Sequence, residues 1–232
     1  MEILRRVIRL KKSAYKRALC ALFSAFLALT MVFPGEVALA ASAPGNVARF
    51  SMTGCSASIV SLSWSKVKGA SGYRIRRYDS KSKKWKTVLT ATKGSAIKGT
   101  VKRLSPATTY KLQIHAYKKA GKKTLYSKKA KTLTVATKPA KVTLQSAKAS
   151  GAKITVSWKK VAASGYQVIY ARNKQFKNGD SILVGGSNKA ATYYAPYSGT
   201  YYVHLRPYKN LNGKKYYGSW SNTKAVKVNI RK

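Results

Sequence analysis

Aromatic and basic side chains alternate near the carboxyl end of the chain, in a pattern that suits contact with a ligand. Tyr202, His204, Arg206 and Tyr208 stand two residues apart, and Tyr217 follows shortly after them. Because successive side chains of a strand point to opposite faces of a sheet, the first four share one face. Aromatic rings and cations on one face stack on sugar rings or bases and hold anions. We therefore predict a ligand-binding surface at Tyr202, His204, Arg206, Tyr208 and Tyr217.

A structural role for these tyrosines is the alternative. Eight of the chain's 16 tyrosines lie between positions 193 and 217. Tyrosine is amphipathic and often covers a sheet while its hydroxyl stays in water. The strand that follows would lie beside this one, so that Tyr217 or Trp220 borders the same face.

Residues for catalysis or metal binding are scarce. Hydrolysis by paired carboxylates needs two acids within about 5–10 Å, but beyond residue 40 the acids are Asp79 and Asp180, which we interpret as separate turn residues. A Ser-His-Asp triad would require His115 or His204, and both are predicted to point outward from a strand. Zinc needs about three or four clustered ligands, whereas Cys55 and the histidines are scattered. We predict no catalytic residue, no metal site, no cofactor and no enzymatic activity.

The net charge is the strongest functional signal in the composition. The 232 residues include 47 Lys+Arg and 4 Asp+Glu, for a formal charge of +43, far more than solubility requires. Lysine outnumbers arginine, which favours diffuse attraction over bidentate recognition of particular groups. The predicted partners are an anionic cell-wall or extracellular polymer, or an acidic protein, with nucleic acid bound only nonspecifically. The alternative is that lysines on outward strand positions protect sheet edges from pairing.

The first 40 residues have the pattern of a secretory signal peptide. A basic segment over residues 2–17 precedes an apolar run from Ala18 to Phe33, and Ala38-Leu39-Ala40 provides small residues for cleavage. An uncleaved N-terminal anchor is the alternative. Cleavage after Ala40 would leave 192 residues with 40 bases, 2 acids and one cysteine, Cys55. We therefore expect a secreted, extracellular chain without a transmembrane segment or an intramolecular disulfide. Its charge would allow it to associate with the cell wall.

The remainder of the chain contains one unit twice. Ser61–Val67 resembles Thr155–Val161, and each is followed by Ser-Gly-Tyr, at residues 71–73 and 164–166. The tryptophans in these segments, Trp64 and Trp158, are 94 positions apart. A unit of this length that occurs twice indicates tandem domains rather than a solenoid. The predicted domains are residues 41–137 and 138–232.

Within each unit the hydrophobic pattern has a period of two. Val60, Leu62 and Trp64 alternate with serines, and Ile154, Val156 and Trp158 do the same in the second unit. Glycine-containing turn signals separate such runs, and no segment beyond residue 40 shows a sustained helical period. Short strands with frequent turns predict an all-β protein of two tandem β-sandwiches.

The first unit resembles a fibronectin type III domain. The resemblance rests on Pro44, Trp64, the Gly72-Tyr73 pair that opens a strand, and the pattern Leu104-x-Pro106-x-Thr108-x-Tyr110. It implies an immunoglobulin-like sandwich in which Tyr110 is the tyrosine of the corner between strands E and F. It also implies a module that usually accompanies catalytic domains as an accessory.

The second unit keeps part of the same pattern. Pro139, Trp158, Tyr166 and Tyr201 match, but the corner reads Ala195-Pro196-Tyr197-Ser198-Gly199-Thr200-Tyr201, without the leucine. The segment Gly213–Ser221 is similar to repeats in secreted proteins of Gram-positive bacteria. The resemblance therefore covers nearly all of the chain after residue 40.

These observations lead to one functional prediction and two alternatives. We predict a secreted, non-enzymatic adhesion or scaffold module that binds a cell-wall phosphopolymer or acidic polysaccharide through distributed lysines. The first alternative is a protein–protein interaction module with an acidic partner. The second is an accessory of an enzyme that acts on cell walls or polysaccharides.

Overall fold

The computed structural model describes residues 42–231, and every regular element in that range is a β-strand. The sixteen strands form two β-sandwiches, which confirms the predicted all-β fold. None of the described segments forms the long apolar helix that crossing a membrane requires. The predicted signal peptide and its cleavage site lie outside the described residues.

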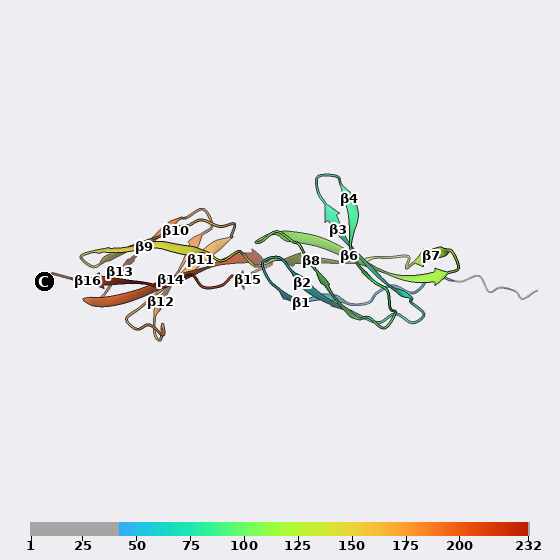
Figure 1. The fold of residues 1–232 in the computed structure, drawn as a ribbon, viewed down its shortest axis with the longest axis horizontal. Helices are drawn as coiled ribbons and strands as arrows, with labels where there is room; N and C mark the ends of the chain where they lie inside the picture. Colours follow the sequence, from blue (N-terminus) through green and yellow to red (C-terminus); the bar gives the residue numbers. More distant parts are fainter. Residues whose placement is uncertain (1–41, 232) are drawn as a thin grey trace, which may run out of the picture. The chain divides into compact units, whose positions relative to one another are not determined.

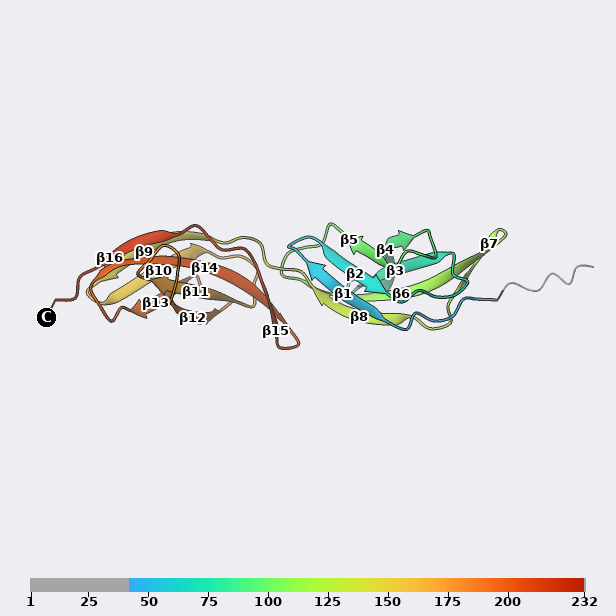
Figure 2. The same cartoon turned by 90° about the horizontal axis from the view of Figure 1, so that it is seen from below.

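The first sandwich contains strands β1 to β8 in two antiparallel sheets (Figures 1 and 2). The smaller sheet has the strand order β1-β2-β5, with β1 at Phe50–Cys55, β2 at Val60–Trp64 and β5 at Lys98–Val101. The larger sheet has the order β4-β3-β6-β7, and β8 also pairs with β6. Its strands are β3 (Gly72–Asp79), β4 (Lys84–Ala91), β6 (Thr109–Ala120), β7 (Lys123–Tyr126) and β8 (Lys131–Ala136).

The second sandwich repeats this arrangement with strands β9 to β16. Its smaller sheet has the order β13-β10-β9, with β9 at Thr143–Ser150, β10 at Lys153–Lys159 and β13 at Ala190–Tyr194. Its larger sheet has the order β12-β11-β14-β15, and β16 also pairs with β14. These strands are β11 (Gly165–Ala171), β12 (Asp180–Gly185), β14 (Gly199–Leu211), β15 (Lys214–Tyr217) and β16 (Lys224–Val228).

Each sandwich has its own hydrophobic core. The alternating residues Val60, Leu62 and Trp64 are buried in the first core, and Ile154, Val156 and Trp158 are buried in the second. Full burial of one such side chain is worth about 1.5–3 kcal/mol. Among the described residues the cysteine is free, so these cores stabilise the sandwiches without a disulfide. The burial pattern confirms the period-two prediction.

The glycine of the repeated Ser-Gly-Tyr motif begins β3 in the first sandwich and β11 in the second. In both strands, the absence of a side chain leaves space for a tyrosine ring. A Cβ on Gly72 would lie 2.6 Å from the hydroxyl oxygen of Tyr117, and one on Gly165 would lie 2.4 Å from that of Tyr208. Both distances are shorter than van der Waals contact, so no larger residue fits without a shift of its neighbours. The glycines therefore determine where the tyrosines of β6 and β14 lie.

The tyrosine of the same motif is buried and bound through its hydroxyl group. Tyr73 Oη accepts a hydrogen bond from the Val67 amide at 2.9 Å and donates one to the Gly94 carbonyl at 3.2 Å. Tyr166 Oη accepts from the Val161 amide at 3.0 Å and donates to the carbonyl of the same residue. A buried hydroxyl is costly unless it is hydrogen-bonded, and both hydroxyls meet that requirement.

The corner tyrosines differ between the two units. Tyr110 Oη accepts a hydrogen bond from the Ser105 amide at 2.7 Å, five residues upstream. Tyr201 Oη instead donates to the carbonyl of Tyr197 at 3.2 Å. The second unit therefore closes its corner without the leucine that its sequence lacks, and with the opposite hydrogen-bond direction.

Candidate ligand-binding site

Four of the five predicted site residues lie on β14, and the fifth ends β15. Tyr201, Val203 and Leu205 are buried in the core, whereas Tyr202, His204 and Arg206 between them are partly exposed on the outer face. Tyr208 and Tyr217 are directly opposite each other in the pairing of β14 with β15, and their ring centroids are 5.8 Å apart. The structure thus places the five residues on the same sheet.

The centre of this face is a continuous stack of side chains. The His204 ring lies between the rings of Phe176 and Trp220, with centroid distances of 3.5 and 3.9 Å and interplanar angles of 8° and 14°. The guanidinium carbon of Arg206 lies 4.3 Å from the Trp220 centroid and 3.8 Å from that of Tyr217. We call these five residues, Phe176, His204, Trp220, Arg206 and Tyr217, the ring stack.

Trp220 lies on the outer face of the larger sheet, in the irregular segment that connects β15 to β16. The Gly218 amide donates to the Pro207 carbonyl and the Ser221 amide donates to the Leu205 carbonyl, both at 2.8 Å. The Leu205 amide in turn donates to Ser221 Oγ at 3.1 Å. These bonds hold residues 218–221 against β14, so that the indole covers His204.

Phe176 comes from the loop between β11 and β12. Its φ is 57°, in the left-handed region, which is uncommon for a bulky side chain. The loop is closed by Asn173, whose side chain accepts a hydrogen bond from the Lys177 amide and donates one to the Lys177 carbonyl. No hydrophobic period in the sequence indicates this contact, and Phe176 is not among the residues of the predicted surface.

The stack contains a neutral histidine beside a charged arginine. Burial, with a smaller contribution from the nearby positive charge of Arg206, lowers the pKa of His204 to about 4. Arg206 Nε donates a hydrogen bond to Gln167 Oε1 at 2.8 Å. Because the histidine is neutral at physiological pH, the guanidinium supplies the only formal charge within the ring stack.

A ligand can reach the residues beside the ring stack more easily than the rings within it. Both faces of the His204 ring are covered, and Arg206 lies between two aromatic rings. Beside the stack, a cleft of about 320 Å³ is lined by Lys174, Tyr202, Thr223 and Ala225. Lys174 Nζ lies 5.9 Å from the Tyr202 ring centroid, so this cleft pairs an aromatic ring with a cation.

The corresponding face of the first sandwich has no such stack. Gln113 occupies the position that corresponds to His204, and Lys129 corresponds to Trp220. His115 contacts Tyr126 edge-on with a centroid distance of 6.3 Å, and its Nδ1 is 3.0 Å from the Ser127 carbonyl oxygen. The ring stack therefore belongs to the second unit among the described residues.

The two acids of the described chain lie in different sandwiches. Asp79 accepts hydrogen bonds from the amides of Lys81 and Ser82 and pairs with Lys86, and the Lys86 contact is the main reason that its pKa falls to about 2. Asp79 ends β3 and Asp180 begins β12, so each of these predicted turn residues lies where a strand meets a turn. Asp180 accepts a hydrogen bond from the Tyr193 hydroxyl. Within residues 42–231, no three His, Cys, Asp or Glu side chains gather as metal ligands.

Comparison with known proteins supports the fold. The fibronectin type III domain family matches residues 42–132. No curated protein matches the sequence.

Several solved structures are similar to this chain at low sequence identity. A two-domain fibronectin type III segment of chicken tenascin is 17 % identical over 81 % of this chain and 100 % of its own, with a TM-score of 0.47. The first three such domains of chicken CNTN1 are 18 % identical over 80 % of this chain and 68 % of that chain, with a TM-score of 0.42. The first sandwich is thus the part of the chain that is similar to the fibronectin type III domain family, and the second sandwich has the same strand arrangement.

Proposed function

We propose that this protein is a secreted, non-enzymatic adhesion or scaffold module that binds an anionic polymer. The polymer would be a cell-wall phosphopolymer or an acidic polysaccharide. Fibronectin type III domains are typically non-catalytic modules of interaction or scaffolding in extracellular or surface proteins. The binding of a polyanion goes beyond that general role and rests on the charge of this chain.

The observation that carries the proposal is the number of cations that have no acidic partner. The chain has 47 Lys+Arg and 4 Asp+Glu. Across residues 42–231 a single ion pair occurs, between Lys86 and Asp79. Many lysines are exposed on both sandwiches, as at Lys122–Lys123 and Lys214–Lys215. Such a surface attracts polyanions, and release of the polymer's counterions adds to the binding free energy.

We assign the local contact of the polymer to the face that carries Tyr202, His204, Arg206, Tyr208 and Tyr217. The support is the cleft beside Tyr202 and the two lysines that flank the ring stack. Lys174 lies near the Tyr202 ring, and Lys215 Nζ lies 5.6 Å from the Tyr208 centroid. Because both faces of His204 and Arg206 are covered, these two residues have a structural role within the ring stack. In this proposal, Tyr202, Tyr208 and the two lysines contact the ligand.

The test is co-sedimentation of residues 42–232, which form a compact unit, with purified Gram-positive cell walls. Binding is measured before and after removal of the anionic phosphopolymers, at about 50 and 500 mM salt. We expect binding that disappears with the polymer and that falls steeply with salt. Binding that is unchanged by both treatments would contradict the proposal.

The exposed edge of β12 supports a protein as a second candidate partner, and the positive charge of the chain favours an acidic one. Leu183 on this strand is 52 % exposed, and β12 pairs with β11 on one side only. An edge of this kind can accept a strand from a partner, and the positive charge would speed association. Recovery of one acidic protein at about 500 mM salt, lost on Leu183→Asp, would favour this candidate.

A further inference from the structure

We propose that one end of the second sandwich holds a separate site for an anionic saccharide. This inference rests on the proposed polyanion binding and names a ligand class for it. The site consists of a cationic cavity and two exposed tyrosines beside it. None of its residues belongs to the ring stack or to the predicted surface around Tyr202.

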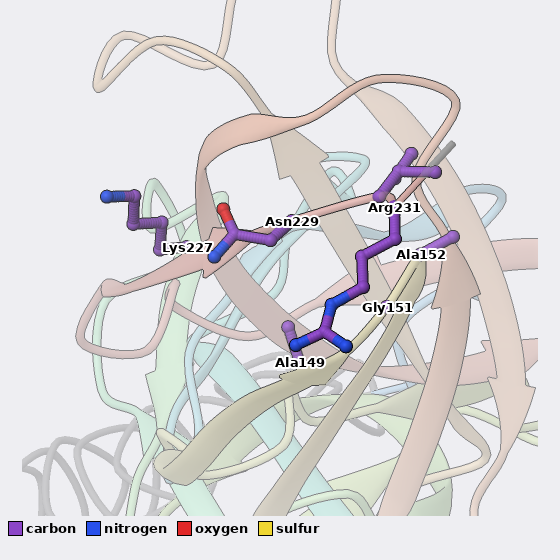
Figure 3. A pocket seen from close by; sticks show the side chains of 7 residues that line it. Ala149, Gly151, Ala152, Lys227, Asn229 and Arg231 are labelled. Atoms are coloured by element: carbon purple, nitrogen blue, oxygen red, sulfur yellow. The ribbon is translucent and has the colours of Figure 1, made fainter.

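The cavity lies between the end of β9 with the turn that follows it and the end of β16 with the chain that follows it (Figure 3). It has a volume of about 500 Å³, within the range of small-ligand sites. Its walls are Ala149, Gly151 and Ala152 on one side and Lys227, Asn229, Ile230 and Arg231 on the other. Figure 3 shows the Arg231 side chain running past Gly151 toward Ala149.

The lining has the donors that an anion requires. Arg231 and the Asn229 amide provide donors within the cavity, and Lys227 adds a positive charge at its rim, with its ammonium end directed away from the other two side chains in Figure 3. No acidic side chain lines the cavity. A carboxylate or phosphate group there would therefore meet donors, with no acidic side chain among the described lining residues to compete with it.

Two exposed tyrosines lie in the segment next to this cavity. Tyr194 and Tyr197 are 69 % and 63 % exposed, the largest values among the bulky hydrophobic side chains of the described residues. Arg172 also lies at this position, with its guanidinium carbon 5.7 Å from the Tyr197 centroid. Exposed aromatic side chains that lie in one short segment form a candidate contact surface.

Hydrogen bonds join the tyrosine segment to both walls of the cavity. The Ala195 amide, next to Tyr194, donates to the Ala152 carbonyl at 2.8 Å. On the other wall, the Ile230 amide donates to the side-chain oxygen of Ser198, next to Tyr197, at 2.9 Å. The segment that carries the two tyrosines is therefore held next to both walls of the cavity.

The combination fits a sugar that carries a charge. The C–H face of a pyranose packs on an aromatic ring, while the phenol hydroxyl can hydrogen-bond to sugar hydroxyls. The neighbouring cations bind the acidic group, whether it is a uronate or a phosphodiester. A single-stranded nucleic acid is less suited, because it needs a row of stacking rings along a basic groove. This end of the sandwich offers two rings and one cavity.

The experiment compares three double variants with the unaltered protein. Tyr194→Ala/Tyr197→Ala removes the rings, and Lys227→Gln/Arg231→Gln removes two charges from the cavity. The control, Lys141→Gln/Lys159→Gln, removes two charges from exposed positions at the other end of β9 and β10. All six side chains are exposed, so unchanged thermal unfolding midpoints are expected and are checked first.

Each protein is titrated with four probes at two salt concentrations. Oligogalacturonate and a glycosyl-phosphate oligomer carry sugar and charge, polyphosphate carries charge alone, and oligothymidylate carries charge and bases. We expect both site variants to bind the two saccharides about tenfold more weakly, equivalent to about 1.4 kcal/mol. The control should change the affinity for saccharides less than about twofold, and the tyrosine variant should leave polyphosphate binding unchanged.

The outcomes separate this inference from the proposed function. If the unaltered protein binds none of the polyanions, the proposed function and this site both fail. If it binds them and the site variants bind the saccharides as well as the control does, this site alone fails. A larger effect of the tyrosine change on oligothymidylate than on both saccharides would also overturn the assignment to saccharides.

Discussion

The indole of Trp220 stacks on the imidazole of His204, with 3.9 Å between the ring centroids and 14° between the planes. Trp220 lies in the irregular segment between β15 and β16, whereas His204 is in the middle of β14. The same indole faces the guanidinium of Arg206. The contact therefore connects the segment between β15 and β16 to the central strand β14. It also partly shields the His204 imidazole and the Arg206 guanidinium from solvent.

Removal of this ring should destabilise the second sandwich. We expect Trp220→Ala to lower the free energy of unfolding by about 1–3 kcal/mol, because a half-buried aromatic contact and a cation–π contact are lost. Lys129→Ala, at the corresponding exposed position of the first sandwich, should change it by less than about 0.5 kcal/mol. Urea denaturation at neutral pH measures both. Equal effects of the two changes would show that the ring stack contributes nothing to stability.

The buried His204 should make stability depend on pH. Its pKa is lowered to about 4 in the folded protein, mainly by burial, and is about 6.5 in the unfolded chain. Between these values the unfolded state binds more protons, so this group's stabilisation is complete above about pH 6.5 and declines as the pH falls toward 4. Because the ring is only partly buried, we expect a loss of about 1–2 kcal/mol after allowing for solvent screening.

The variant that isolates this effect is His204→Gln, which copies Gln113 of the first sandwich. Denaturant titrations from pH 7 to pH 4 should show a flatter dependence for His204→Gln than for the unaltered protein. A parallel decline in both proteins would assign the acid sensitivity to other groups.

The close approach of Tyr117 to Gly72 predicts a strict requirement for glycine. A Cβ at this position would lie 2.2 Å from the Ala91 carbonyl oxygen and 2.6 Å from Tyr117 Oη. We expect Gly72→Ala to destabilise the first sandwich by about 1–3 kcal/mol. Gly54→Ala is the matched control, since nothing lies within 4 Å of its Cβ position. A thermal unfolding midpoint for Gly72→Ala as high as that of Gly54→Ala would contradict this explanation of the Ser-Gly-Tyr motif.

The cleft beside the ring stack provides a test of the predicted ligand surface. Tyr202→Ala should weaken binding to isolated wall phosphopolymer by about threefold at about 50 mM salt, because one aromatic platform next to Lys174 is lost. Tyr216→Ala lies in β15 outside the predicted set and serves as the control. Fluorescence anisotropy with labelled polymer measures both affinities, and a greater loss for Tyr216→Ala would place the contact elsewhere.

Much of the fold could be predicted because its determinants are local and repeated. The alternation at Val60, Leu62 and Trp64 predicted a strand with one buried face, and the structure buries all three. The recurrence of Ser-Gly-Tyr predicted the start of the same strand in both units. The first feature depends on the two-residue hydrophobic period, and the second depends on the absence of a side chain at glycine. Both can be read directly from the sequence.

The candidate site could be predicted only in part. Because side chains alternate between the two faces of a strand, the sequence predicted that Tyr202, His204 and Arg206 share one outer face. The burial pattern agrees with this prediction. The alternation could not show that Phe176 covers His204, since that contact depends on a loop with two residues at positive φ. The partner of Asp180 could not be predicted for a similar reason, because Tyr193 lies on a strand of the other sheet.

By itself the sequence determined the fold class, the duplication and the excess of positive charge, which are properties of composition and of short-range period. The tertiary structure alone decided which side chains meet across strands and loops. It enclosed His204 between two rings, and it joined Tyr194 and Tyr197 to a cavity lined by Lys227 and Arg231. Such contacts depend on sheet register and loop conformation, which no single stretch of the chain specifies.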